Sequence, residues 1–165
     1  MKVLLLSDTH NYLDETILKH CREADEIWHA GDFGTAKISD SLNAVKPLRG
    51  VYGNIDGQEL RKMHPELLFF TVENVTVLMM HIGGYPGSWS RNTEELITRY
   101  QPHVFICGHS HILKIMRDPK HKNMLCINPG AAGKSGFHQM RTMVRMTIEK
   151  GKVNLLEVIE MGRKE

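Results

Sequence analysis

The chain has 165 residues, enough for a hydrophobic core, and we expect residues 1–165 to form one domain. Its hydrophobic content of 41% and charged content of 24% are ordinary for a globular protein, and a formal net charge of +2 excludes general attraction to nucleic acid or anionic membranes. Three cysteines without a CxxC pair argue against a disulfide framework, and no apolar run is long enough to span a bilayer. We therefore expect a cytoplasmic protein that does not bind membranes.

The first two thirds of the chain alternate between strand and helix patterns. Short apolar runs predict strands at residues 3–6, 27–30, 51–52, 67–72, 75–80 and 104–107. Apolar residues at helical spacing predict helices at residues 13–23, 36–43 and 92–100. Glu73 and Asn74 predict a hairpin turn, and the glycine-rich residues 83–87 predict a loop. Such alternation is typical of a sheet with parallel strands.

The last third of the chain has a different pattern. Strand-like runs follow one another with no helix between them, at residues 112–116, 124–127, 140–148 and 153–159. Lys150 and Gly151 predict a tight turn, so antiparallel strands are expected here and the fold class is α/β with mixed sheets. Arg141 and Arg145 share a strand face, for which a solvated edge is the default expectation.

Five predicted strands end in residue types that bind metal ions. Together these residues are Asp8, His10, Asp32, Asn54, His81, His109 and His111. Side chains two positions apart on an extended strand face the same way, so Asp8 and His10 are expected to reach one point. Because the carboxyl ends of strands line the binding crevice of open α/β sheets, we expect all seven residues to converge.

The residue types also indicate which metals are bound and how many. Imidazole, carboxylate and amide groups without a thiolate suit manganese, iron, zinc, cobalt or nickel better than a closed structural zinc site. Seven residues are too many for one ion but serve two ions when a carboxylate bridges them, and Asp32 is the candidate bridge. Because only two of the seven are acids, a pair of divalent ions keeps a net positive charge that suits phosphate.

The ordered motifs resemble those of one known family. They are Asp8-Thr9-His10, Gly31-Asp32, Gly53-Asn54, His81 and Gly108-His109-Ser110-His111. This set is similar to that of the calcineurin-like metallophosphoesterase superfamily, and the compact size resembles its small bacterial and archaeal phosphodiesterase branch. The resemblance implies a sandwich of two mixed β-sheets flanked by helices.

The resemblance also implies how the metals are held. One ion would be bound by Asp8, His10, Asp32 and His111. The other would be bound by Asp32, Asn54, His81 and His109. Mn²⁺ is the first expectation for both, with iron, zinc, nickel or cobalt as alternatives.

The expected reaction is hydrolysis of a small phosphate ester by in-line attack of a hydroxide that bridges the two metals, with Asp32, Asn54 and His81 as catalytic residues. Asn54 and His109 are expected to contact the substrate, and Tyr85 and His138 are further candidates. Tyr85 can stack on a nucleobase, although an ordinary loop or a subunit contact is the commoner role for such a residue.

Two departures from the family pattern bear on the reaction. The position after Gly53-Asn54, a histidine or a cysteine in many relatives, is Ile55 here and cannot protonate a leaving group. The proton must come from metal-bound water or another side chain such as His138, or good leaving groups must be favoured. Asp56 is expected to order the turn or orient a ligand. Residues 128–131 resemble the Asn-Pro-Gly-Ser loop that closes the site in relatives, with alanine in place of serine.

A phosphodiester is the expected substrate, because it carries one negative charge fewer than a fully ionised monoester. The alternatives are a broad-specificity phosphomonoesterase and a protein-binding scaffold, like the retromer subunit of this superfamily, whose metal site has degenerated. All seven metal-ligand positions hold competent residues, which favours an enzyme over a scaffold. Relatives in this branch often self-associate, so the resemblance also implies a homo-oligomer.

Overall fold

Two β-sheets carry the fold of residues 1–164, which are the residues that this computed structural model describes. Within that range the first sheet has five strands, in the order β12 (Lys152–Arg163), β11 (Met140–Glu149), β1 (Lys2–Leu6), β2 (Glu26–His29) and β3 (Leu48–Gly50). The second sheet also has five described strands, in the order β4 (Leu67–Val72), β5 (Val75–Met80), β8 (Val104–Ile106), β10 (Met124–Pro129) and β9 (Leu113–Asp118).

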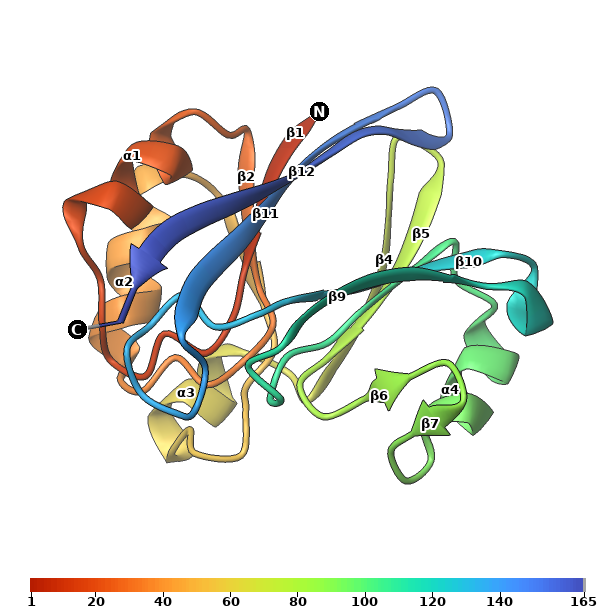
Figure 1. Ribbon diagram of the computed structural model, residues 1–165, viewed down its shortest axis with the longest axis horizontal. Coiled ribbons are helices and arrows are strands. Elements are labelled where there is room, and N and C mark those ends of the chain that lie inside the picture. The colour runs from red at the N-terminus through yellow and green to blue at the C-terminus, as the bar shows by residue number, and fades with distance from the viewer. Residues whose placement is uncertain (165) are drawn as a thin grey trace.

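Helices and a small hairpin cover the outer sides of the two sheets. The helices are α1 (Glu15–Arg22), α2 (Ala36–Val45), α3 (Gln58–Met63) and α4 (Thr93–Tyr100), and the hairpin pairs β6 (Gly84–Tyr85) with β7 (Ser88–Trp89). Figure 1 shows α1, α2 and α3 on the side of the first sheet, and α4 with β6 and β7 on the side of the second. Within residues 1–164, no helix is long and apolar enough to cross a membrane.

Both sheets mix parallel and antiparallel pairs. Strands β1, β2 and β3 run parallel, whereas β11 pairs antiparallel with both β1 and β12. In the second sheet β5, β8 and β10 run parallel, with β4 and β9 antiparallel at the edges. The predicted fold, a sandwich of two mixed sheets flanked by helices, is confirmed.

Strand β1 shows why its sequence is apolar throughout. Val3 and Leu5 pack into the core between the two sheets, while Leu4 and Leu6 pack outward against the helices. Helix α1 meets that outer face, and it begins at Glu15 because the Asp14 carboxylate accepts the Ile17 amide (2.9 Å). A strand that is buried on both faces loses the alternation of apolar and polar residues.

Several expected elements differ from the structure. The strand expected at 51–52 lies earlier, as β3, because the chain leaves the sheet after Gly50 to form the loop before α3. Helix α3 was not predicted, and Leu60 is its one buried residue, so it leaves no apolar period in the sequence. The loop expected at 83–87 contains β6, and a short 3₁₀ turn, Pro119–His121, joins β9 to β10.

The solvated edge expected at Arg141 is wrong. The Arg141 side chain is buried, donates from Nε to the Ala132 carbonyl (2.8 Å) and pairs with Asp14 (2.9 Å). Strand β11 is not an edge strand, because β12 pairs with it, and the contacts with Ala132 and Asp14 tie the Arg141 side chain to the cap of α1. Arg145 is partly exposed and pairs with Glu23 (2.7 Å).

A stack of rings lies at the end of β2. The imidazole of His29 stacks on Phe33 with 3.7 Å between centroids, and Phe33 stacks on His64 at 4.7 Å. The Gly31 amide donates to His29 Nδ1 (3.1 Å), so the His29 proton is on Nε2 and faces Thr9 Oγ1 (3.0 Å). Burial lowers the pKa of His29 to about 3, which keeps the ring neutral.

We predict that this neutral histidine makes the fold sensitive to mild acid. Its pKa is about 3 in the folded chain and 6.5 in the unfolded reference, so the unfolded state binds more protons and stability falls as pH drops below 6.5. Between about pH 7.5 and about pH 5 the loss from this one group reaches about 2 kcal/mol. Urea unfolding of wild type and His29→Gln in EDTA measures it. The variant should lose less stability over that range, and identical pH slopes would contradict the prediction.

Candidate metal centre

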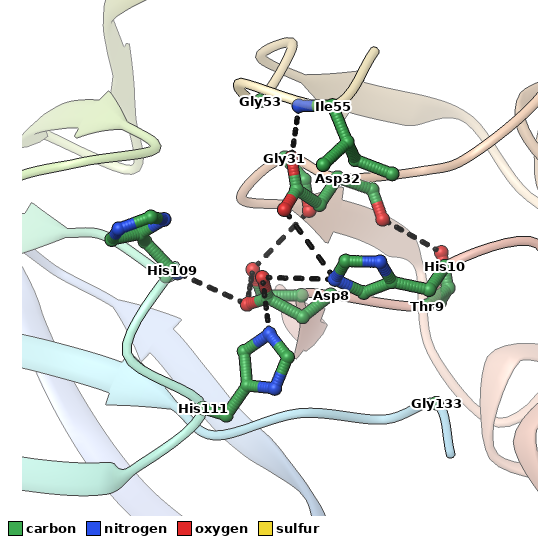
Figure 2. A network of polar contacts seen from close by, with 12 residues as sticks. Asp8, Thr9, His10, Gly31, Asp32, Gly53, Ile55, His109, His111 and Gly133 are labelled. Carbon is green, nitrogen blue, oxygen red and sulfur yellow. Dashed lines mark hydrogen bonds and ion pairs between the residues drawn. The ribbon is translucent and has the colours of Figure 1, made fainter. Parts of the chain in front are cut away.

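The seven residues singled out in the sequence meet at one end of the sandwich. They come from the loops that follow β1, β2 and β3 in the first sheet and β5 and β8 in the second. Figure 2 shows Asp8 beside His10 and His111, with Asp32 above it and His109 approaching from the second sheet. The site is therefore built where the carboxyl ends of strands from both sheets face each other.

The nitrogen and oxygen atoms form two adjoining clusters. In one cluster, single atoms of Asp8, His10 and His111 all lie within 4.8 Å of one another, and the same holds for Asp32, His81 and His109. The clusters touch, because His10 Nε2 is 3.4 Å from Asp32 Oδ2. Each cluster contains one carboxylate and two imidazoles, which is a donor set suited to a divalent transition metal.

Asn54, the seventh residue, belongs to the second cluster. Its Oδ1 atom lies 3.0 Å from His109 Nδ1, and both side chains are exposed at the mouth of the site. An amide oxygen in this place can complete a coordination shell or face a bound substrate.

Unpartnered atoms test whether metals fit these clusters. Among the described residues, Asp8 Oδ1, His10 Nε2 and His81 Nε2 are buried and have no hydrogen-bond partner. Buried polar atoms normally have one, because leaving them unpaired costs free energy. His81 Nδ1 donates to the Ala30 carbonyl (2.7 Å), which leaves Nε2 as the nitrogen that faces the site and binds a metal when it is deprotonated. The residues therefore fit a bound cation.

Each carboxylate gives one oxygen to the protein and directs the other to the imidazoles. Asp8 Oδ2 accepts from Ser7 Oγ (2.7 Å) and from the His109 amide (3.1 Å), while its Oδ1 lies 3.2 Å from His111 Nε2. Asp32 Oδ1 accepts the Ile55 amide (3.1 Å), while its Oδ2 lies 3.2 Å from His81 Nε2. The oxygens left for metals are thus held in fixed positions.

Charge in the site keeps both carboxylates ionised. Burial by itself would raise the pKa of Asp8, but attraction to the His10 and His111 imidazoles beside it holds that pKa far below its usual range. Burial also opposes ionisation of Asp32, and His81 overcomes it and lowers the pKa of Asp32. An ionised carboxylate is the form that binds a metal.

Glycines in the motifs let the loops approach the carboxylates. A Cβ atom on Gly53 would lie 2.0 Å from Asp32 Oδ1, and one on Gly108 would lie 2.1 Å from Ser7 Oγ. Any side chain at these positions would displace the groups that orient the ligands. The glycine before Asn54 and the glycine before His109 are therefore part of the site's construction.

The extended-strand geometry expected to bring Asp8 and His10 to one point is wrong, although their side chains do meet. Asp8 and His10 have φ angles of 54° and 44°, and His109 and His111 have φ angles of 71° and 62°. These are left-handed conformations, so the pairs do not lie on an extended strand. The backbone turns sharply after β1 and after β8. The first turn brings Asp8 and His10 into one cluster, and the second directs His109 and His111 to different clusters.

Two buried side chains hold the loops, and only part of their role is predicted from sequence. The Asp56 carboxylate accepts the amides of Gly53 (2.8 Å), Phe33 (3.2 Å) and Gly34 (2.9 Å), so it joins the Asp32 loop to the Asn54 loop. The expectation that Asp56 orders this turn is confirmed, but its reach to the other loop was not predicted.

Asn128 holds the loop that carries His109 and His111. Its Nδ2 donates to the Gly108 carbonyl (2.9 Å) and to Ser110 Oγ (3.0 Å), and its Oδ1 accepts the Gly130 amide (3.0 Å). The residues beyond it close on the first strand, because the Gly133 amide donates to the Asp8 carbonyl (3.2 Å).

The two further substrate-contact candidates lie in different places. Both ring nitrogens of His138 are engaged, Nε2 with the Gly133 carbonyl (2.9 Å) and Nδ1 with His111 Nδ1 (3.3 Å). This placement favours a role in orienting His111 over the proton-donor role. Tyr85 lies on β6, away from the clusters, and is 41% exposed.

The fold and the two clusters together define a protein of the metallophosphoesterase type. A sequence model described as the calcineurin-like phosphoesterase superfamily domain matches residues 1–151. The chain belongs to this superfamily, as its motifs predict.

Individual relatives agree with this assignment. A probable metallophosphoesterase from Methanothermobacter thermautotrophicus is 27% identical over 138 residues, covering 79% of this chain and 77% of the relative. Another from Mycoplasma pneumoniae is 31% identical over 116 residues, covering 67% of this chain and 68% of the relative. Wild-type Vps29 from Entamoeba histolytica, crystallised with zinc, shares the fold with a TM-score of 0.75 at 17% identity, over 97% of this chain and 99% of that one.

We predict that His138 sets the metal affinity of the first cluster. Because its Nε2 proton is given to the Gly133 carbonyl, its Nδ1 accepts the His111 Nδ1 proton and leaves the His111 Nε2 lone pair for a metal. His138→Ala should weaken Mn²⁺ binding about 10- to 100-fold, measured by competition with a chelator. The exposed His103, which contacts Thr76, supplies the control His103→Ala. Unchanged affinity in His138→Ala would contradict the prediction.

Proposed function

We propose that the protein is a metal-dependent phosphodiesterase with a dinuclear centre. The observation that carries the proposal is the pair of adjoining clusters, whose unpartnered ligand atoms face a shared space. Asp32 is the proposed bridge, because its Oδ2 lies within 3.4 Å of imidazoles from both clusters. One ion is assigned to Asp8, His10, Asp32 and His111, and the other to Asp32, Asn54, His81 and His109.

Bound divalent ions supply Lewis-acid stabilisation of phosphoryl oxygens and a water of lowered pKa as the nucleophile. The protein's own residues position these groups. The Ile55 amide fixes the orientation of the Asp32 carboxylate, and the His109 amide fixes that of Asp8. Asn54 and His109 are the exposed polar side chains of the second cluster, so they are placed to contact phosphoryl oxygens.

Two cavities beside the clusters support a diester as the substrate. One, of about 200 Å³, is lined partly by His109, and the other, of about 230 Å³, is lined partly by Asn54 and His81. Ile82 lines both, so the two recesses lie on either side of it. A phosphodiester has two substituents and fills both recesses, whereas a monoester leaves one empty.

We predict metal-dependent hydrolysis of bis(p-nitrophenyl) phosphate that depends on the bridging carboxylate. Asp32→Asn should lower the Mn²⁺-supported rate by more than about 100-fold, because the variant loses charge that fixes both ions. The exposed Asp40 on α2 gives the control Asp40→Asn, which should keep the wild-type rate. Faster turnover of p-nitrophenyl phosphate would indicate the phosphomonoesterase, and no turnover of either ester with any divalent metal would indicate a scaffold.

We also predict a steep dependence of the rate on the leaving group. The Ile55 side chain is 47% exposed at the mouth of the site and has no proton to donate. Ile55→His keeps the backbone amide that holds Asp32 and adds a proton donor, so it should raise the rate for poor leaving groups by up to about 100-fold. Rates for aryl diesters of increasing leaving-group pKa measure this, with Ile55→Leu as the matched control. Equal slopes in Ile55→His and wild type would rule out a missing general acid.

A further inference from the structure

The cavity beside His109 differs in its lining from the metal centre. It lies on the outer face of the second sheet, where the β6–β7 hairpin faces β9 and β10. Ile112, just before β9, lines the cavity with Lys114 and Met116 of that strand, while Leu113 and Ile115 pack in the core between the sheets. The period of the strand thus directs one set of side chains into the cavity.

The cavity is continuous with the candidate metal centre. Its lining includes Gly108, His109 and Ser110 from the loop that carries two of the metal-ligand candidates. Ile82, which follows His81, completes the rim on that side. A substituent attached to a phosphate at the clusters can therefore enter the cavity directly.

The lining combines apolar side chains with a few polar ones and carries no negative charge. Among the described residues, the cavity wall contains no aspartate or glutamate. Burial raises the pKa of the Cys107 and Cys126 thiols to about 12, so both are neutral. A cationic substituent finds no carboxylate to pair with here.

A cation and an aromatic face stand at the opening of the cavity. Lys114 Nζ lies 3.4 Å from the ring centroid of Tyr85, which is a cation–π contact. Tyr85, Ile82 and Ile112 are 41%, 40% and 62% exposed, so apolar surface around the cavity is left in water. Exposed apolar patches of this kind mark binding sites.

We propose that this cavity binds an aromatic substituent of the phosphodiester, a planar ring that carries a hydrogen-bond acceptor. The proposal rests on the proposed function for the position of the phosphate. The volume of about 200 Å³ suits one ring with a polar group, since a cavity of about 150 Å³ holds benzene. The ring packs against Ile112 and Met116 beside Tyr85, and the Lys114 ammonium, which lies over the Tyr85 ring, donates to its acceptor.

The experiment compares phenylphosphonate with methylphosphonate, which present the same anionic group to the metals and differ in the ring. Binding to the Mn²⁺-loaded protein is measured by isothermal titration calorimetry. We expect phenylphosphonate to bind about tenfold or more tightly, because the ring leaves water for an apolar cavity. Equal affinities would overturn the proposal.

Two variants locate the ring. Met116→Trp fills the cavity and Tyr85→Ala removes its aromatic wall, and each should abolish the preference for the phenyl compound. The control Leu155→Ala shortens an exposed apolar side chain on β12 and should keep the phenyl preference. A preference that survives in both cavity variants places the ring elsewhere and overturns the proposal. If Met116→Trp also loses binding of methylphosphonate, the tryptophan has disturbed the metal centre. The phenyl preference of Tyr85→Ala then tests the proposal.

Turnover of bis(p-nitrophenyl) phosphate in the same preparations separates the two proposals. Hydrolysis without a phenyl preference would leave the phosphodiesterase in place and remove the aromatic site. A phenyl preference without hydrolysis would support the aromatic site and contradict the proposed reaction.

Discussion

Two buried carboxylates, Asp8 and Asp32, impose the constraint on which the rest of the structure depends. In each, hydrogen bonds from the protein hold one oxygen, and imidazole nitrogens lie around the other. The same contacts therefore set the charge of the carboxylate and the direction of its free oxygen. A buried carboxylate without compensation is costly, and the compensating imidazoles come from both sheets. The sandwich must therefore bring the carboxyl ends of β1 and β2 against those of β5 and β8, and the parallel pairing within each sheet does so.

The loops carry the conformational cost of this arrangement. Five candidate ligands (Asp8, His10, Asp32, His109 and His111) have left-handed backbone conformations, which non-glycine residues adopt only where the surroundings hold them. Buried hydrogen bonds to Asp56 hold the loops of Asp32 and Asn54, and those of Asn128 hold the loop of His109 and His111. The same rigidity fixes the ligand atoms before any metal binds, and preorganised ligands favour binding because less order must be imposed afterwards.

The sequence predicts the fold class, most strands and the identity of the clustered residues, because buried strands end abruptly in polar residues of recognisable type. The hairpin of β4 and β5 is predicted with its bounds because its apolar runs flank a clear turn. Helix α3 is missed because Leu60 alone is buried, and the burial of Arg141 is missed because it depends on Asp14, which is distant in the sequence. The cavity beside His109 could not be predicted, since it forms only when the β6–β7 hairpin folds over β9. Local sequence patterns predict strands and helices. Contacts between residues far apart in the sequence are seen only in the folded structure.

The central claim is that two metal ions share one site through Asp32. Electron paramagnetic resonance of the protein titrated with Mn²⁺ tests it most directly, because neighbouring Mn²⁺ ions couple magnetically and a single ion does not. We expect two Mn²⁺ to bind per chain with a coupled spectrum, and Asp32→Asn to lose the coupling. Saturation at one Mn²⁺ per chain with an uncoupled spectrum would contradict it.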